Sequence, residues 1–132
     1  MTPIPNTGYY GNGTPEFREI IWIGSSRADA HEFPEKVRKE IGTALTAAQF
    51  GRHHPSVKVL GGFKGASVRE VVVDDPAGTF RVVFTVKYRE AIYGLHSFQK
   101  KSKSGIKTPK EDVQRINARL AAAEEDHEAR FG

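Results

Sequence analysis

Two residues of this sequence are suited to chemistry: His96, which stands alone in its segment, and Arg81, which interrupts a run of apolar residues. The imidazole of His96 can give or take a proton near neutral pH, because the ordinary histidine pKa is about 6.5. A guanidinium in a half-buried strand requires an anionic partner, either a ligand or an acidic side chain such as Glu70. A lone histidine at a strand end is more often a hydrogen-bonded structural residue than a catalytic one. Both His96 and Arg81 therefore have a structural interpretation as well as a chemical one.

Positive charge is concentrated in two segments that contain no acidic residue. The chain carries 20 Lys and Arg against 16 Asp and Glu, which gives a net charge of +4 and a pI near 9.4. The basic residues of these two segments, 51–69 and 91–110, are Arg52, Lys58, Lys64, Arg69, Lys100, Lys101, Lys103, Lys107 and Lys110. Such a distribution favours an acidic or nucleic-acid partner, although a basic loop can also be simply a solvated surface.

The composition excludes several classes of protein. The chain has 132 residues, of which 38% are hydrophobic and 27% are charged, as is typical of one globular domain. It contains no cysteine, which excludes disulfides and cysteine nucleophiles and suits the reducing cytoplasm. No run of about 18 apolar residues occurs, so we expect a cytoplasmic protein without a membrane partner.

No motif for a cofactor or a metal is present. The sequence lacks the Walker and Gly-x-Gly-x-x-Gly patterns, and its glycine-rich residues 61–65 precede a predicted strand rather than a helix. His53 and His54 have no third ligand at a suitable spacing, so we interpret them as exposed residues. We expect no cofactor and no metal, which leaves any reaction to the side chains alone.

The elements that must position these side chains follow from periodicity and turn residues. The pattern predicts strands over 17–23, 67–73, 79–88 and 91–98, a helical pair over 27–50 that restarts at Pro34, and a last helix that begins at Pro109 after a Thr108 cap. The polar end of that helix, from Glu124, is expected to fray. The order strand-helix-helix-strand-strand-strand-helix predicts an α+β fold with a small, mostly antiparallel sheet. We interpret residues 1–15 as a flexible arm and 16–132 as a single domain with a helical C-terminal tail.

Alternation along the strands predicts which side chains share a face. Arg81 points away from the apolar face of its strand. In the last strand Gly94, His96 and Phe98 share one face, where the glycine leaves space for a ligand against the sheet. With the helical pair covering one face, the other face stays partly free as a candidate site.

A continuous motif runs through the last strand and the basic segment after it. Residues 93–103 read YGLHSFQKKSK and are followed by Lys107-Thr108-Pro109. The upstream pieces of the same pattern are Phe33-Pro34, Gln49-Phe50-Gly51, Lys58-Val59-Leu60, Val68-Arg69-Glu70 and Phe80-Arg81-Val82. Together they resemble the HigB-like, phage-derived branch of the RelE/ParE toxin superfamily, over about residues 17–120.

The resemblance implies a RelE-like fold and the toxin of a type II toxin–antitoxin system. Such a toxin is a metal-independent endoribonuclease, an mRNA interferase that cuts messenger RNA on the ribosome and inhibits translation. Its partner is a cognate antitoxin of the helix-turn-helix type. One position departs from the pattern: many relatives carry an arginine two residues after the glutamate that matches Glu70, and here that residue is Val72.

The residue types suit RNA cleavage by attack of the 2′-hydroxyl on the adjacent phosphate. In this interpretation His96 is the acid or base, and Arg81 and Lys100 bind the phosphate oxygens as the other catalytic residues. Phe98 stacks on a base. The remaining RNA-binding candidates are Lys58, Lys64, Arg69, Lys101 and Lys103.

Two other functions stay open. One is a ParE-like module that inhibits DNA gyrase without catalysis, against which His96 and the lysine-rich segment argue. The other is an inactive toxin-derived domain that only binds a partner, an alternative that Val72 supports.

Overall fold

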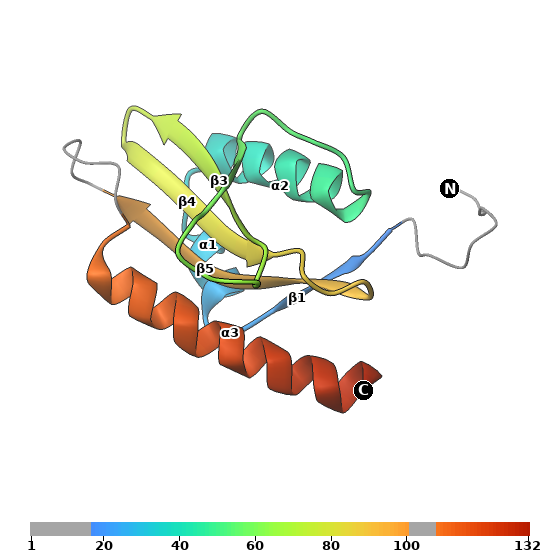
Figure 1. Ribbon diagram of the computed structural model, residues 1–132. Helices are drawn as coiled ribbons and strands as arrows, with labels where there is room; N and C mark the ends of the chain where they lie inside the picture. The colour runs from blue at the N-terminus through green and yellow to red at the C-terminus, as the bar shows by residue number, and fades with distance from the viewer. Residues whose placement is uncertain (1–16, 101–107) are drawn as a thin grey trace.

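The computed structural model describes residues 17–100 and 108–132 and places a five-stranded sheet between helices (Figure 1). In chain order the elements are β1 (Glu19–Trp22), α1 (Ser26–His31), α2 (Glu35–Gln49), β2 (Val57–Val59), β3 (Val68–Asp75), β4 (Gly78–Thr85), β5 (Ala91–Lys100) and α3 (Lys110–Phe131). The predicted α+β class with a mostly antiparallel sheet is confirmed. The predicted arm, 1–15, lies outside the described residues.

The strands are ordered β1-β5-β4-β3-β2, with β1 parallel to β5 and every other pair antiparallel. The strands predicted over 67–73, 79–88 and 91–98 are therefore β3, β4 and β5, which form an antiparallel meander. The sequence reading missed β2, because this strand has only three residues and lies in a segment rich in glycine, proline and charge. Its partner is β3, so β2 forms the edge of the sheet.

One face of the sheet, which we call the α1–α2 face, packs against the two N-terminal helices. Val37, Ile41 and Leu45 recur at intervals of four residues, so they form a single buried stripe along α2. This stripe belongs to a core that includes Phe80 of β4, whose ring centroid lies 4.8 Å from that of Phe33. Burial of this stripe fixes α2 against the strands.

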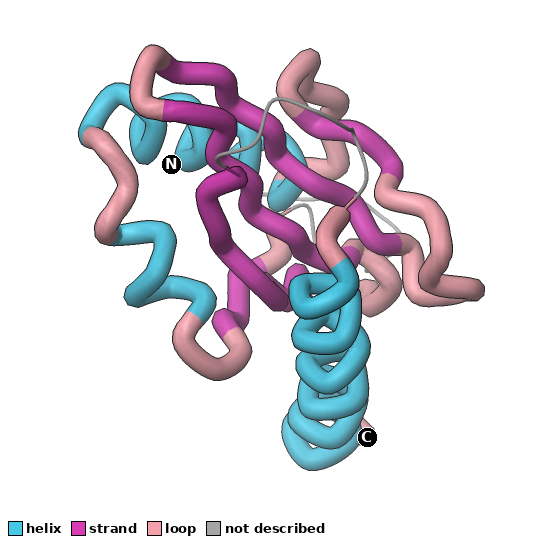
Figure 2. Tube along the Cα trace, turned by 90° about the vertical axis from the view of Figure 1, so that its left-hand side faces the viewer, coloured by secondary structure: helices cyan, strands magenta, loops and turns pink. Residues whose placement is uncertain are grey.

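The opposite face, which we call the α3 face, is covered in part by the C-terminal helix (Figures 1 and 2). Ile116 and Ala123 of α3 are fully buried against this face. The expected fraying after Glu124 is wrong, because Asp126 accepts a 2.8 Å hydrogen bond from the Tyr93 hydroxyl and His127 stacks on Tyr88 with the ring centroids 4.1 Å apart. None of the helices within the described ranges is long and apolar enough to cross a membrane.

A β-bulge in β5 changes which side chains share a face. Val83 of β4 pairs with His96, but the next residue, Phe84, pairs with Gly94, so Leu95 is an extra residue in β5. The carbonyl of Leu95 accepts a 2.9 Å hydrogen bond from Nη1 of Arg119 on α3. The bulge is therefore held by the helix that crosses it.

The bulge overturns the prediction that Gly94, His96 and Phe98 share a face. Gly94 lies on the α1–α2 face, whereas His96 and Phe98 lie on the α3 face. The expected space for a ligand at Gly94 is also absent, because a Cβ there would collide with the ring of Trp22. A strand with one extra residue reverses its alternation, and nothing in the amino-acid pattern marks that position.

The fit of Trp22 over Gly94 can be tested with a pair of glycine substitutions. We expect Gly94→Ala to lower the free energy of unfolding by about 1–3 kcal/mol, because the added methyl group must displace a rigid indole. Gly42, in the middle of α2, is the matched control, since a Cβ there meets no heavy atom within 4 Å. Gly42→Ala should instead stabilise the protein by up to about 1 kcal/mol through helix propensity. Equal stabilities of the two variants in denaturant titrations would contradict the packing described.

Candidate functional site

The predicted catalytic side chains gather on the part of the α3 face that the helix leaves partly open. In the ladder, Arg81 of β4 lies between Val72 of β3 and Phe98 of β5. The next row places Val83 between Glu70 and His96. The site is therefore built on three neighbouring strands.

Arg81 forms a buried ion pair with Glu70. Its Nη1 lies 2.8 Å from Oε1 of Glu70, and the exposed fractions of the two side chains are 12% and 8%. The structural alternative considered for Arg81 is thus confirmed. Within the described part of the chain, the buried Nε of Arg81 has no hydrogen-bond partner, so the guanidinium keeps donor capacity beyond the ion pair.

His96 is buried between Phe98 and the start of α3. Its side chain is 3% exposed, its Nε2 lies 2.6 Å from Oδ1 of Asp112, and its ring stacks on that of Phe98 with centroids 4.8 Å apart. Burial lowers the pKa of His96 below its ordinary value, and the hydrogen bond to Asp112 opposes this shift only in part. The imidazole is therefore neutral near neutral pH.

The tautomer of the neutral ring follows from its partners. Asp112 accepts a hydrogen bond, so Nε2 of His96 carries the hydrogen and Nδ1 carries the lone pair. Among the described residues Nδ1 has no partner. This arrangement is that of a carboxylate–histidine dyad, in which the carboxylate orients an imidazole base.

The lysines of the predicted site are placed differently. Lys58 of β2 pairs in register with Glu70, so it lies on the α3 face. Its side chain is exposed there. Lys100 ends β5 opposite Thr79, two residues beyond Phe98 and on the same face. Lys64 is exposed in the loop between β2 and β3. Lys101 and Lys103 lie outside the described residues.

Arg69 is not brought together with the others. It pairs in register with Phe84, which belongs to the core of the α1–α2 face, so its side chain leaves the sheet on the side opposite Arg81. There it lines a separate pocket with Arg52 and His54.

Asp112 is the site residue that sequence reasoning missed. Its only signal was an acidic residue in the first turn of the last helix, which the helix dipole explains equally well. Across the described ranges, no group of three or more histidine, aspartate or glutamate side chains is placed to hold a metal ion.

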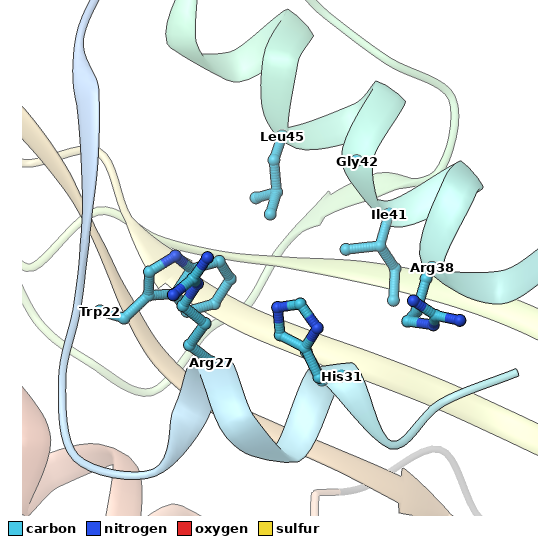
Figure 3. A pocket seen from close by; sticks show the side chains of 8 residues that line it. Trp22, Arg27, His31, Arg38, Ile41, Gly42 and Leu45 are labelled. Carbon is cyan, nitrogen blue, oxygen red and sulfur yellow. The ribbon is translucent and has the colours of Figure 1, made fainter. Parts of the chain in front are cut away.

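A hollow distinct from the pocket at Arg69 lies between α1 and α2, on the side of the sheet opposite His96 (Figure 3). It has a volume of about 220 Å³ and an apolar lining that includes Trp22, Ile41 and Leu45. Arg27 and Arg38 add positive charge to it. Because Trp22 covers Gly94 on the α1–α2 face, this hollow is separated from His96 by the sheet.

A protein-family model matches most of the chain. Residues 28–121 match the model of a family described as phage derived protein Gp49-like (DUF891). The matched range includes Arg81, His96 and Asp112. No curated protein matches the chain.

A double-mutant cycle can measure what the Arg81–Glu70 pair contributes to stability. We expect Arg81→Ala to lower the free energy of unfolding by about 3–5 kcal/mol, because it leaves the Glu70 carboxylate buried without a partner. The double variant Glu70→Ala/Arg81→Ala should lose less than the sum of the two single changes. Additive losses in denaturant titrations would show that the two side chains do not interact.

Proposed function

The chain belongs to the Gp49-like family of phage derived proteins, a family within the RelE/HigB-type toxin group, and from this premise we propose that it is the toxin of a type II toxin–antitoxin pair. We further propose that it is a ribosome-dependent endoribonuclease that cuts messenger RNA. The observation that carries the proposal is the grouping of Arg81, Phe98 and Lys100 on the α3 face of two neighbouring strands, with the His96–Asp112 dyad beside them.

These groups supply what cleavage of RNA by its own 2′-hydroxyl requires. The 2′ oxygen attacks the adjacent phosphorus, its proton passes to Nδ1 of His96, and the bond from phosphorus to the 5′ oxygen breaks. The products are a cyclic phosphate and a 5′-hydroxyl, whose proton comes from water. The hydroxide that remains takes the proton from Nδ1 of His96 and restores the neutral ring. Arg81 and Lys100 stabilise the negative charge that develops on the phosphorus oxygens.

The burial of the dyad supports a requirement for the ribosome. The Nδ1 atom that would accept the proton is covered in the free protein, so the base becomes effective only when bound RNA reorders the groups around it. Stacking of a base on Phe98 would disturb the contact that now covers His96. A site of this kind is inactive until its substrate is presented in a defined conformation.

Val72 bears on the strength of catalysis. It lies opposite Arg81 in the ladder, so the arginine that many relatives carry at this position would stand beside the Arg81 guanidinium. We propose that the chain cuts RNA with one arginine fewer in the site. Inactive binding of a partner is the alternative that this substitution favours.

The proposed partner is a cognate antitoxin, a small helix-turn-helix protein with acidic residues that face the basic segment 100–110. It would neutralise the toxin by covering the positive surface that otherwise meets RNA. Residues 101–107 of this segment lie outside the described residues.

The proposed activity can be tested with purified protein and a programmed ribosome. We expect cleavage of messenger RNA in the ribosomal A site, mapped by its new 5′ ends, and little cleavage of the same RNA without ribosomes. A parallel assay of DNA supercoiling serves as the control for gyrase inhibition. Intact message together with inhibited gyrase would replace the proposal by a ParE-like function, and intact message with active gyrase would replace it by an inactive binding domain.

The role of His96 can be tested by substitution and pH. His96→Gln should lower the single-turnover cleavage rate by about 10²–10⁴, since it removes the base, and Asp112→Asn should lower it through loss of the tautomer. The control is His31→Gln, at an exposed histidine of α1, which should cleave at the normal rate.

The pH dependence has a definite direction. The base must be neutral, and burial lowers the pKa of His96, so the cleavage rate should stay constant around neutral pH and fall only below the ordinary histidine range. A rate that rises with acidity would mean that His96 does not act as a base. Normal rates for a thermally stable His96→Gln variant would remove the residue from the catalytic group.

A further inference from the structure

A basic pocket lies on the α1–α2 face, away from the site of Arg81 and His96. It has a volume of about 280 Å³ and takes its cationic groups from three separate segments. Arg18 precedes β1, Arg52 and His54 follow α2, and Arg69 projects from β3. Ala48, Val57 and Phe84 provide its apolar part. Three segments that are distant in sequence therefore place positive side chains around one hollow.

The three arginines and His54 bring hydrogen-bond donors to this pocket. The N–H of Ser56 donates to Nδ1 of His54 over 3.0 Å, so the remaining hydrogen of that neutral ring is on Nε2. Arginine has donors only. Nη1 of Arg18 is held by the carbonyls of Val86 and Tyr88, at 3.1 and 2.8 Å, which fixes its guanidinium at the pocket.

The charges in the pocket are not neutralised by the protein. None of the described residues that line it is acidic. Across residues 17–100 and 108–132, neither Arg52 nor Arg69 forms an ion pair, in contrast to Arg81 with Glu70. Like charges that converge on a hollow without a counter-ion repel one another and attract an anion from solution.

We propose that this pocket binds a phosphate group. Three arginines favour a ligand rich in acceptors, and a tetrahedral phosphate presents oxygens in several directions to donors that come from separate segments. The hollow is open enough to take a phosphate within an RNA backbone. Binding of an RNA phosphate in this pocket rests on the proposed function. A free phosphate satisfies the same donors, so the test includes both.

Binding to RNA is measured with a short 2′-O-methyl RNA, which cannot be cut by attack of its own 2′ oxygen. We expect Arg69→Gln and Arg52→Gln each to weaken binding about tenfold at low salt. Each should also reduce the slope of log affinity against log salt by about 1, since one phosphate contact is lost. Arg27→Gln is the matched control, because it removes the same charge from an exposed position outside this pocket.

Free phosphate is tested by titrating inorganic phosphate and following the ring resonances of His54. A saturable shift in the wild-type protein that Arg69→Gln abolishes supports the site and shows that phosphate alone suffices. No such shift, combined with RNA affinity that depends on Arg69 but not on Arg27, supports the site with RNA as its source. Equal weakening by Arg27→Gln and Arg69→Gln, or no effect of Arg69→Gln on either ligand, overturns the proposal.

The outcome is independent of the proposed cleavage. Cleavage and phosphate binding are both measured on the wild-type protein, and phosphate binding is read at His54, on the face of the sheet opposite His96. Loss of cleavage with intact phosphate binding would therefore leave this inference standing. Intact cleavage with unaltered binding in Arg69→Gln and Arg52→Gln would reject it and leave the proposed function untouched.

Discussion

The one-residue bulge at Leu95 is the constraint on which the arrangement of the candidate site depends. Before it, Gly94 faces α1 and α2 and accepts the ring of Trp22. After it, His96 and Phe98 face α3. Without the extra residue, alternation would place the imidazole and its aromatic neighbour on the α1–α2 face, away from Arg81 and Asp112. The hydrogen bond from Arg119 to the Leu95 carbonyl means that α3 both stabilises this register and covers the site that the register creates.

The arginines on the two faces of the sheet differ in burial and in the pairing of their charges. On the α3 face, Arg81 is nearly buried and its charge is matched by Glu70. On the α1–α2 face, Arg52 and Arg69 line an open pocket to which the described part of the chain contributes no acidic side chain. A buried charge must be paired to be tolerated, whereas a charge near solvent can stay unpaired and attract a ligand. Arginine is thus part of a buried ion pair on one face of the sheet and lines an open pocket on the other.

The covered dyad of His96 and Asp112 suits the proposed nuclease, which would act only on RNA that is presented to it. A histidine kept neutral by burial and oriented by a carboxylate has the chemistry of a base, but its reactive atom is not open to solvent. Both residues of the dyad lie within the range that matches the Gp49-like family. Substrate presentation by a larger assembly would then provide the selectivity that a shallow surface on a small domain does not provide by itself.

The sequence by itself determined the class of the fold and most of its elements. Periodicity located α2 through Val37, Ile41 and Leu45, and turn residues located the meander of β3, β4 and β5, because these signals are local. It also named Glu70 as one candidate partner for Arg81, beside an anionic ligand, and the structure shows that ion pair. Short strands with few apolar residues, such as β2, carry too little local signal to be found.

Only the tertiary structure decided how the faces are composed. The bulge at Leu95, the partnership of His96 with Asp112 and the separation of Arg69 from Arg81 each depend on contacts between residues far apart in the chain or on a shift of register. A helical or strand period reports which side of one element a residue occupies. It carries no information about an extra residue in a strand or about which helix lies across that strand. Some residues of the site could therefore be predicted from the sequence, but their arrangement could not.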